Sequence, residues 1–227
     1  MARRGERLRA LADQLAGRHG TQTRLLALDL GQGEAMNALA EATAAVDVGL
    51  LVAAAGYGSS GPLVAGDLAD ELGQLQVNAG AVLAQCWHFG RVFSAQGRGG
   101  IVLMSSIVAF QGTSVAVNYA ATKAYVQSLA EGLRHELKTV HVDVIASAPG
   151  PVASGFGVRA GMRMARTVAP NVVARETLAA LGRRSTVRPG GLSKLLGRSL
   201  ATAPRAMRVS MMGRIMAGMA DPSGPVV

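Results

Sequence analysis

The sequence contains little of several residue types on which common classes of protein depend. It has one cysteine in 227 residues, Cys86, which excludes an internal disulfide framework and fits a reducing cytoplasm. Its four histidines lack the spacing of metal ligands, and no metal site is expected. No run of 18 apolar residues and no apolar signal segment is present. The sequence therefore predicts a cytoplasmic globular protein in which Cys86 is a buried, inert thiol.

Acidic residues are scarce in the last third of the chain. Residues 155–227 contain 12 basic residues (Lys and Arg) but 2 acidic residues (Asp and Glu). Residues 1–154 contain 11 basic and 12 acidic residues. The net charge of +9 therefore belongs to the C-terminal third. Aromatic residues make up 4%, and no basic patch is interleaved with them, so nucleic-acid binding is not predicted.

Apolar periodicity predicts strands that alternate with helices. Strands are expected at residues 25–29, 48–56, 101–104 and 140–146, with a short edge strand at 185–189. Helices are expected at residues 3–15, 34–45, 67–93, 118–137, 172–181, 192–200 and 206–219. Alternation of this kind implies right-handed crossovers, and hence a doubly wound parallel sheet in a single α/β domain over residues 1–227.

Polar or small residues follow four of the expected strands. Asp29, Ala55–Gly56, Ser106 and Pro149–Gly150 each stand where a strand ends. A doubly wound sheet binds its ligand beyond the carboxyl ends of its strands, so these residues are candidates for one site. Asn78 interrupts an apolar helical face, and a buried amide needs a partner or a task.

Tyr119 and Lys123 form the pair most indicative of chemistry. Four residues apart on one helix, their side chains share a face. A cation beside a phenol favours the phenolate, so Lys123 is expected to lower the pKa of Tyr119 and fit it for proton transfer. The simpler interpretation is an ordinary amphipathic helix, since the two residues alone are a weak signal.

A strand ending in Ser106, followed by a helix with Tyr119-x-x-x-Lys123, resembles the short-chain dehydrogenase/reductase family. The resemblance runs from residue 1 to about residue 155 and implies a Rossmann-like fold. It also implies hydride transfer between a nicotinamide cofactor and a carbonyl or secondary alcohol. Asn78, Ser106, Tyr119 and Lys123 then match the catalytic tetrad. Tyr119 would donate the proton, Ser106 would polarise the oxygen, Lys123 would also hold the ribose, and Asn78 would hold a water.

The resemblance also implies a set of cofactor-binding residues. Asp29 and Leu30 would lie at the adenine, and Ala55 and Gly56 would form the turn beneath the cofactor. Two alanines, Ala53 and Ala54, replace the asparagines usual in that turn, which puts its bracing in doubt. The nicotinamide loop would be residues 149–154. Its candidate contacts are Pro149, Gly150, Val152 and Ser154, the last standing where threonine is more usual.

The sequence departs from the family at its start. The glycine-rich turn of the family, Gly-x-x-x-Gly-x-Gly, is not found in the sequence. The resemblance therefore implies that roughly the first 30 residues of the family pattern, one strand–helix–strand unit, are missing. Either the N-terminus is truncated, or the chain is a degenerate relative without a cofactor. Ala2 stands where relatives that use NAD carry an aspartate. Arg3, which follows it, suits a 2′-phosphate and favours NADP over NAD. Alternatively, Arg3 and Arg4 are a solvated helix start.

The region of residues 155–227 is interpreted as a substrate loop followed by basic, Met-rich helices. These helices either pack on the domain with their arginines in water, cover an acyl-chain pocket or contact an anionic membrane. Loop residues such as Val115, Phe156 and Met162 favour a hydrophobic carbonyl or alcohol substrate, and the protein is expected to be a homo-oligomer. The alternative function is a non-catalytic binding or regulatory protein with the same fold.

Overall fold

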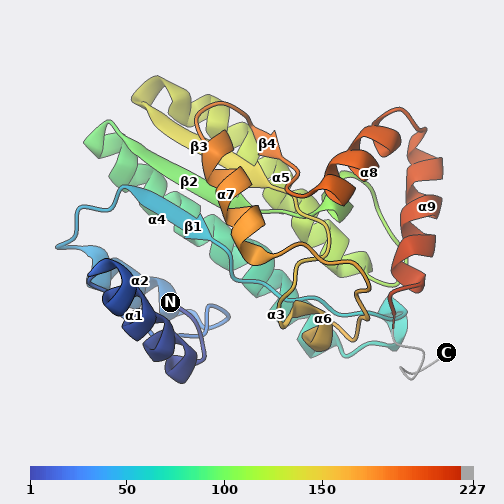
Figure 1. Ribbon diagram of the computed structural model, residues 1–227, viewed down its shortest axis with the longest axis horizontal. Coiled ribbons are helices and arrows are strands. Elements are labelled where there is room, and N and C mark those ends of the chain that lie inside the picture. The colour runs from blue at the N-terminus through green and yellow to red at the C-terminus, as the bar shows by residue number, and fades with distance from the viewer. Residues whose placement is uncertain (221–227) are drawn as a thin grey trace. The chain divides into compact units, whose positions relative to one another are not determined.

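The computed structural model describes residues 1–220 (Figure 1). These residues form two compact units, one of residues 1–47 and one that begins at Val48.

The first unit consists of two helices joined by an extended segment. α1 (Gly5–His19) ends at Gly20, the predicted stop, whose positive φ of 62° suits glycine. α2 (Ala35–Thr43) lies within its predicted range. The prediction of a strand at residues 25–29 is wrong, because this segment forms a single parallel bridge, between Ala27 and Ala2. A strand needs a partner along its length, and here the partner is a single residue.

A four-stranded parallel sheet forms the centre of the second unit. Its strands are β1 (Leu50–Ala53), β2 (Gly99–Met104), β3 (Val142–Ser147) and β4 (Thr186–Val187), in the spatial order β1-β2-β3-β4. Figure 1 shows α4 and α5 on one face of this sheet and α7 on the other. The predicted doubly wound, Rossmann-like α/β fold is thereby confirmed.

Helices connect the strands, and most lie close to their predicted bounds. They are α3 (Leu68–Leu75), α4 (Ala81–Gln96), α5 (Val117–Leu137), α6 (Phe156–Arg159), α7 (Pro170–Ala180), α8 (Gly191–Ala201) and α9 (Arg205–Ala217). Short 3-10 turns occupy Leu63–Ala65, Ile107–Phe110 and Lys138–Val140. One long helix was predicted at residues 67–93. The structure instead divides it into α3 and α4 by the π-helical segment η2 (Gln76–Gly80), which contains Asn78.

The core of the second unit lies around β2 and β3, where Ile101, Leu103 and Ile145 are fully buried. β1 is different. In the described part of the chain it is hydrogen-bonded to β2 alone, and its residues alternate between exposed and buried. Leu50 and Val52 are 41% and 51% exposed, so apolar side chains of β1 remain in contact with solvent. The missing strand–helix–strand unit stays a prediction.

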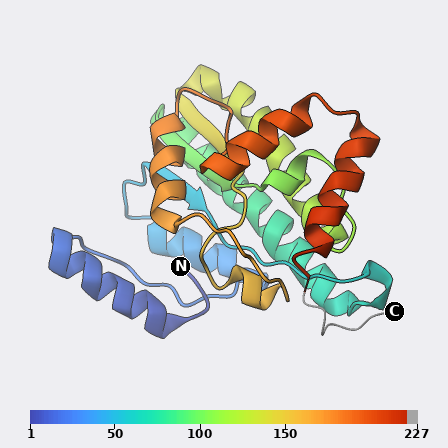
Figure 2. The same cartoon turned by 45° about the vertical axis from the view of Figure 1, so that its right-hand side comes forward.

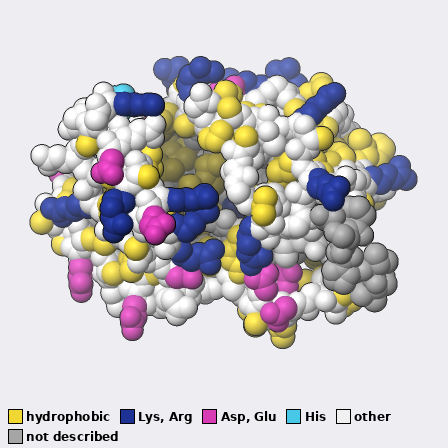
Figure 3. Space-filling view, turned by 60° about the horizontal axis from the view of Figure 1, so that its bottom comes forward, with side chains coloured by type: hydrophobic (Ala, Val, Ile, Leu, Met, Phe, Trp, Pro, Cys, Tyr) yellow, Lys and Arg dark blue, Asp and Glu magenta, His cyan; other side chains and the backbone are white. Residues whose placement is uncertain are grey.

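The C-terminal helices pack at one end of the sheet, beside the start of α5 (Figure 2). Met212 and Met216 of α9 are buried in a cluster with Ile107, Ala120 and Met162. The arginines of α9 are exposed or half-buried. This agrees with the predicted arrangement in which the helices pack on the domain with their arginines in water. Figure 3 shows a face on which Lys and Arg side chains stand between hydrophobic ones. Every helix within residues 1–220 is too short or too polar to cross a bilayer.

Candidate active site

The second unit brings the predicted proton donor and its partners together. Tyr119 lies in the first turn of α5, and its side chain lies close to that of Ser106, which follows β2 and lowers the pKa of the Tyr119 phenol. Lys123 follows one turn later, with Nζ 5.8 Å from the centre of the Tyr119 ring. Ser106 is held in place because Ile107 N–H donates to the Pro149 carbonyl oxygen at 3.0 Å. The chain thus assembles Ser106, Tyr119 and Lys123 around one point, as the sequence predicted.

Burial controls the titration of Tyr119. Desolvation raises the pKa of Tyr119 to about 12, and the hydrogen bond from Ser106 lowers it only in part. The expectation that Lys123 would bring the Tyr119 pKa below its usual value is therefore wrong for this structure. A phenol that keeps its proton at neutral pH is the form that a proton donor requires.

Lys123 is buried among uncharged groups. Desolvation lowers its pKa to about 8. Its Nζ donates to the Met104 carbonyl oxygen at 2.8 Å, at the end of β2. An ammonium has two further N–H donors, which suit the hydroxyls of a ribose.

Asn78 braces the turn that follows β1. The fully buried Asn78 amide donates from Nδ2 to the Tyr57 carbonyl oxygen at 2.8 Å and to Thr122 Oγ1 at 3.1 Å. Its Oδ1 accepts from the Tyr57 backbone N–H at 3.0 Å. A Cβ on Gly56 would stand 2.9 Å from this oxygen, so the turn requires glycine. Ala53 and Ala54 have no side-chain amide with which to brace this turn, and Asn78 braces it instead. The water predicted beside Asn78 stays a prediction.

The predicted nicotinamide loop is tied at both ends. Near its start, the Gly150 backbone N–H donates to Oγ of Ser193, a buried residue of α8, at 2.7 Å. Near its end, Val152 forms a parallel bridge with Val168, while the Ser154 hydroxyl accepts from the Phe156 backbone N–H. The C-terminal helices therefore help to fix a loop that the sequence assigned to the core.

The first unit holds the other predicted cofactor residues. The Ala2–Ala27 bridge places Arg3 beside Asp29, and Nη1 of Arg3 lies 3.7 Å from the Asp29 carboxylate. Asp29 also accepts from the Gly31 backbone N–H at 2.9 Å, while Leu30 is buried. Arg3, Asp29 and Leu30 thus lie together at one end of two extended segments. Ala55, Gly56, Pro149, Gly150, Val152 and Ser154 belong to the second unit.

Glu71 is a residue of this region that the sequence analysis missed. Its carboxylate accepts from Asn118 Nδ2 at 2.7 Å and from Ser59 Oγ at 2.7 Å. Because Asn118 precedes Tyr119, Glu71 joins α3 to the turn of α5 that carries the proton donor. No local pattern marks this role, because the partner lies 47 residues away.

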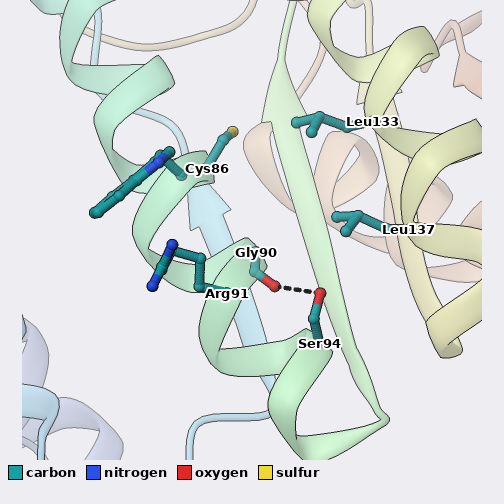
Figure 4. A pocket seen from close by; sticks show the side chains of 7 residues that line it. Cys86, Gly90, Arg91, Ser94, Leu133 and Leu137 are labelled. Atoms are coloured by element: carbon teal, nitrogen blue, oxygen red, sulfur yellow. Dashed lines mark hydrogen bonds between the residues drawn. The ribbon is translucent and has the colours of Figure 1, made fainter.

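A surface hollow lies between α4 and α5, away from these residues (Figure 4). It is lined by Cys86, Trp87, Gly90, Arg91, Ser94, Leu133 and Leu137. Cys86 is buried, and desolvation raises its pKa to about 12, so the thiol is inert as predicted. Among residues 1–220, no group of His, Cys, Asp and Glu side chains could hold a metal ion.

Comparison with known sequences identifies the family. A sequence model of the short chain dehydrogenases matches residues 1–164. The chain belongs to this family. A 7beta-hydroxysteroid dehydrogenase of Clostridium sardiniense is 25% identical over 224 residues, which cover 97% of this chain and 86% of that enzyme. A 3-oxoacyl-acyl-carrier-protein reductase of Aquifex aeolicus is 32% identical over 148 residues, 64% of this chain and 60% of the relative.

Solved structures of family members share the fold. A structure of a 7beta-hydroxysteroid dehydrogenase superposes with a TM-score of 0.85 at 23% identity, over 93% of this chain and 84% of the other. A short-chain dehydrogenase from Sphingobium yanoikuyae in complex with NADPH has a TM-score of 0.77 at 24% identity, over 88% and 81%. The family consists of oxidoreductases that act on CH–OH groups, and this chain has the family's fold.

Proposed function

We propose that this protein is an NADP-dependent oxidoreductase that interconverts an apolar ketone and its secondary alcohol. The observation that carries the proposal is the closeness of the Ser106 and Tyr119 side chains, with the buried Lys123 one turn away. Such a constellation can hold a carbonyl oxygen and give it a proton, which is what reduction of a ketone requires.

Each of the two units carries residues whose chemistry suits part of a nicotinamide dinucleotide. Lys123 has donors for the ribose next to the nicotinamide, and the Pro149–Ser154 loop is fixed in place by Ser193. In the first unit, Arg3 is 64% exposed at its side chain and carries the charge that a 2′-phosphate needs. When bound, the cofactor supplies the hydride that no side chain can supply.

In the reduction, the carbonyl carbon gains the hydride while the carbonyl oxygen gains the Tyr119 proton. Ser106 donates a hydrogen bond to that oxygen and stabilises the negative charge that develops on it. Charged Lys123 then stabilises the phenolate that Tyr119 becomes, and this phenolate regains its proton from solvent. Oxidation of the alcohol is the reverse, with the Tyr119 phenolate as the base.

Apolar surroundings favour a hydrophobic substrate. Tyr119 packs against a cluster formed by Ile107, Val108, Ala116, Ala120, Ala160, Met162, Leu200, Met212 and Met216. Relatives include dehydrogenases named for the 7beta-hydroxysteroids, and a bulky-bulky ketone specific alcohol dehydrogenase from Comamonas testosteroni shares the fold with a TM-score of 0.74. We therefore propose a bulky, apolar ketone as the substrate.

A homo-oligomer is part of the proposal. The outer faces of α3 and α4 carry exposed apolar side chains at helical spacing, namely Leu68, Leu72, Leu75, Leu83 and Trp87. Exposed apolar side chains of this kind favour association of copies. Light scattering should give a mass of at least two chains, and Leu83→Glu with Trp87→Glu should reduce it. Contact of the basic C-terminal helices with a membrane stays a prediction.

The alternative is a non-catalytic binding or regulatory protein with this fold. Titration with NADPH, followed by its absorbance after addition of a panel of ring ketones, separates the two. The enzyme should bind NADPH and oxidise it with one ketone or more, and Ser106→Ala should slow this by about 10². A protein without NADPH affinity would contradict the proposal.

A further inference from the structure

A cluster of three side chains fastens α6 to α3, and the two helices lie side by side in Figure 1. Arg159, the last residue of α6, forms an ion pair with the Asp70 carboxylate of α3. Its guanidinium also lies over the Tyr57 ring, 4.5 Å from the ring centre. The Tyr57 hydroxyl donates in turn to the Asp70 carbonyl oxygen at 3.0 Å. Arg159, Asp70 and Tyr57 are called the α6 clamp.

The segment next to the clamp is held as well. Ser60 Oγ donates to the Gly161 carbonyl oxygen at 3.1 Å, just after α6. Ala160 N–H donates to the Phe156 carbonyl oxygen at 2.9 Å, which closes the single turn of helix. A helix of four residues is not stable by itself, so its position depends on tertiary contacts such as these.

Phe156 stands at the other end of the same turn, against the proton donor. The Phe156 and Tyr119 rings are 5.1 Å apart between centres and tilted by 51°. Gly58 makes room for both rings. A Cβ at Gly58 would lie 2.8 Å from Phe156 Cζ and 3.3 Å from Tyr119 Cδ2. The half-buried Phe156 ring therefore forms a wall beside Tyr119.

We infer that the α6 clamp positions Phe156 as the wall on which a bulky apolar ketone packs when it reaches Tyr119. Phe156 is thus a determinant of substrate specificity, and Arg159 is a positioning residue that acts through it. The inference rests on the proposed function, because it concerns the substrate of the same site. An arginine suits the clamp because its planar group can pair with a carboxylate and stack on a ring at once.

Amide hydrogen exchange tests the clamp without any need for activity. Arg159→Ala should speed exchange of the Ala160 and Met162 amides by about tenfold, since their hydrogen bonds depend on the position of α6. Val158→Ala is the matched control, because Val158 lies on the same turn and is 89% exposed. Its exchange should equal that of the wild type. Equal exchange in Arg159→Ala and Val158→Ala would overturn the clamp.

Kinetics with two ketones test the wall. For a fused-ring ketone, Phe156→Ala should raise KM by about tenfold with kcat nearly kept, because apolar contact is lost. For a three-carbon ketone that cannot reach the wall, neither constant should change. Arg159→Ala should also raise KM for the fused-ring ketone, but by a smaller factor than Phe156→Ala. Arg159→Lys, which keeps the charge but not the stacking, should lie between Arg159→Ala and the wild type.

Gly58→Ala would press on the Phe156 ring at 2.8 Å and, less closely, on the Tyr119 ring at 3.3 Å, so it should also lower kcat for both ketones. It should reproduce the KM increase of Phe156→Ala while amide exchange near Arg159 stays at the wild-type rate. An active wild type whose ratio of kcat/KM for the two ketones is unchanged in Phe156→Ala and Gly58→Ala would overturn the inference. A wild type that reduces neither ketone with NADPH would instead contradict the proposed function, and the exchange result would still decide the clamp.

Discussion

Asn78 and the Tyr57 backbone exchange two hydrogen bonds across 21 residues, one in each direction, at 2.8 and 3.0 Å. The side chain of a π-helical turn thereby fixes the shape of the loop after β1. Removing the amide leaves polar groups of that loop without partners. We expect Asn78→Ala to lower the free energy of unfolding by about 2–4 kcal/mol, the cost of one or two unsatisfied buried groups. Urea unfolding followed by circular dichroism measures it.

Asn78→Asp separates the two bonds. The carboxylate can accept from Tyr57 N–H but cannot donate to the Tyr57 carbonyl oxygen, and it places a charge in a fully buried position. It should therefore be no more stable than Asn78→Ala at pH 7. Wild-type stability in either variant would show that the brace contributes nothing.

Lys123 gives the stability of the second unit a pH dependence. Its pKa is about 8 in the folded chain and 10.5 in the unfolded chain, so between these values the unfolded chain binds more protons. Stability must then rise with pH. Between pH 8 and pH 9 we expect a gain of about 1 kcal/mol from this residue. In Lys123→Met, chemical unfolding at both pH values should show that this gain has gone.

The window from pH 8 to pH 9 keeps an opposing effect small. Burial raises the pKa of Cys86 from 9.0 to about 12, so ionisation of this thiol in the unfolded chain lowers stability by about 0.3 kcal/mol in that window and by more above pH 9. Cys86→Ala should remove that loss and increase the gain between pH 8 and pH 9 by about the same amount. A gain of the same size in Lys123→Met and the wild type would contradict the assignment.

Activity should also depend on pH through Lys123 rather than Tyr119. The pKa of Tyr119 is raised to about 12, so its phenol remains protonated over the usual range of assays. The charge on Lys123 is lost above about pH 8. The value of kcat/KM for ketone reduction should therefore be level below pH 8 and fall above it. A Lys123→Arg variant that retains activity should lack this fall, and a wild-type profile level to pH 10 would exclude Lys123 as its cause.

Arg3 should decide between the two nicotinamide cofactors. If it contacts the 2′-phosphate, Arg3→Ala should weaken NADPH binding by about 10- to 100-fold, the scale of a charge-assisted hydrogen bond, and leave NADH binding unchanged. Arg4→Ala provides a control with the same change of charge at the next position. Isothermal titration measures both cofactors. Equal losses in the two variants would show that only the general positive charge matters.

Local patterns predicted most of the helices and the four strands of the sheet, because each has its own apolar periodicity. The segment at residues 25–29 has a strand-like sequence but lacks a neighbour along its length, and only Ala27 pairs. The α6 turn was missed because four residues are too few for a period to show. Tyr119, Lys123 and Ser106 were predictable from spacing, since two share a helix and one ends a strand.

Other parts of the site depend on contacts that no local pattern encodes. Glu71 reaches Asn118, Ser193 reaches Gly150, and Arg159 reaches Asp70, each across more than 40 residues. The pKa of Tyr119 was predicted in the wrong direction for a related reason. Sequence spacing showed the nearby lysine but not the depth of burial, and desolvation is the larger effect.

The most direct test of the proposed chemistry is NADPH oxidation by Tyr119→Phe with a bulky ketone that the wild type reduces. The ring stays and the hydroxyl goes, so packing against Phe156 and affinity for NADPH should be nearly unchanged. Turnover should fall by about 10² or more, the usual scale for loss of a general acid. Full turnover in Tyr119→Phe would contradict the assignment of Tyr119 as the proton donor.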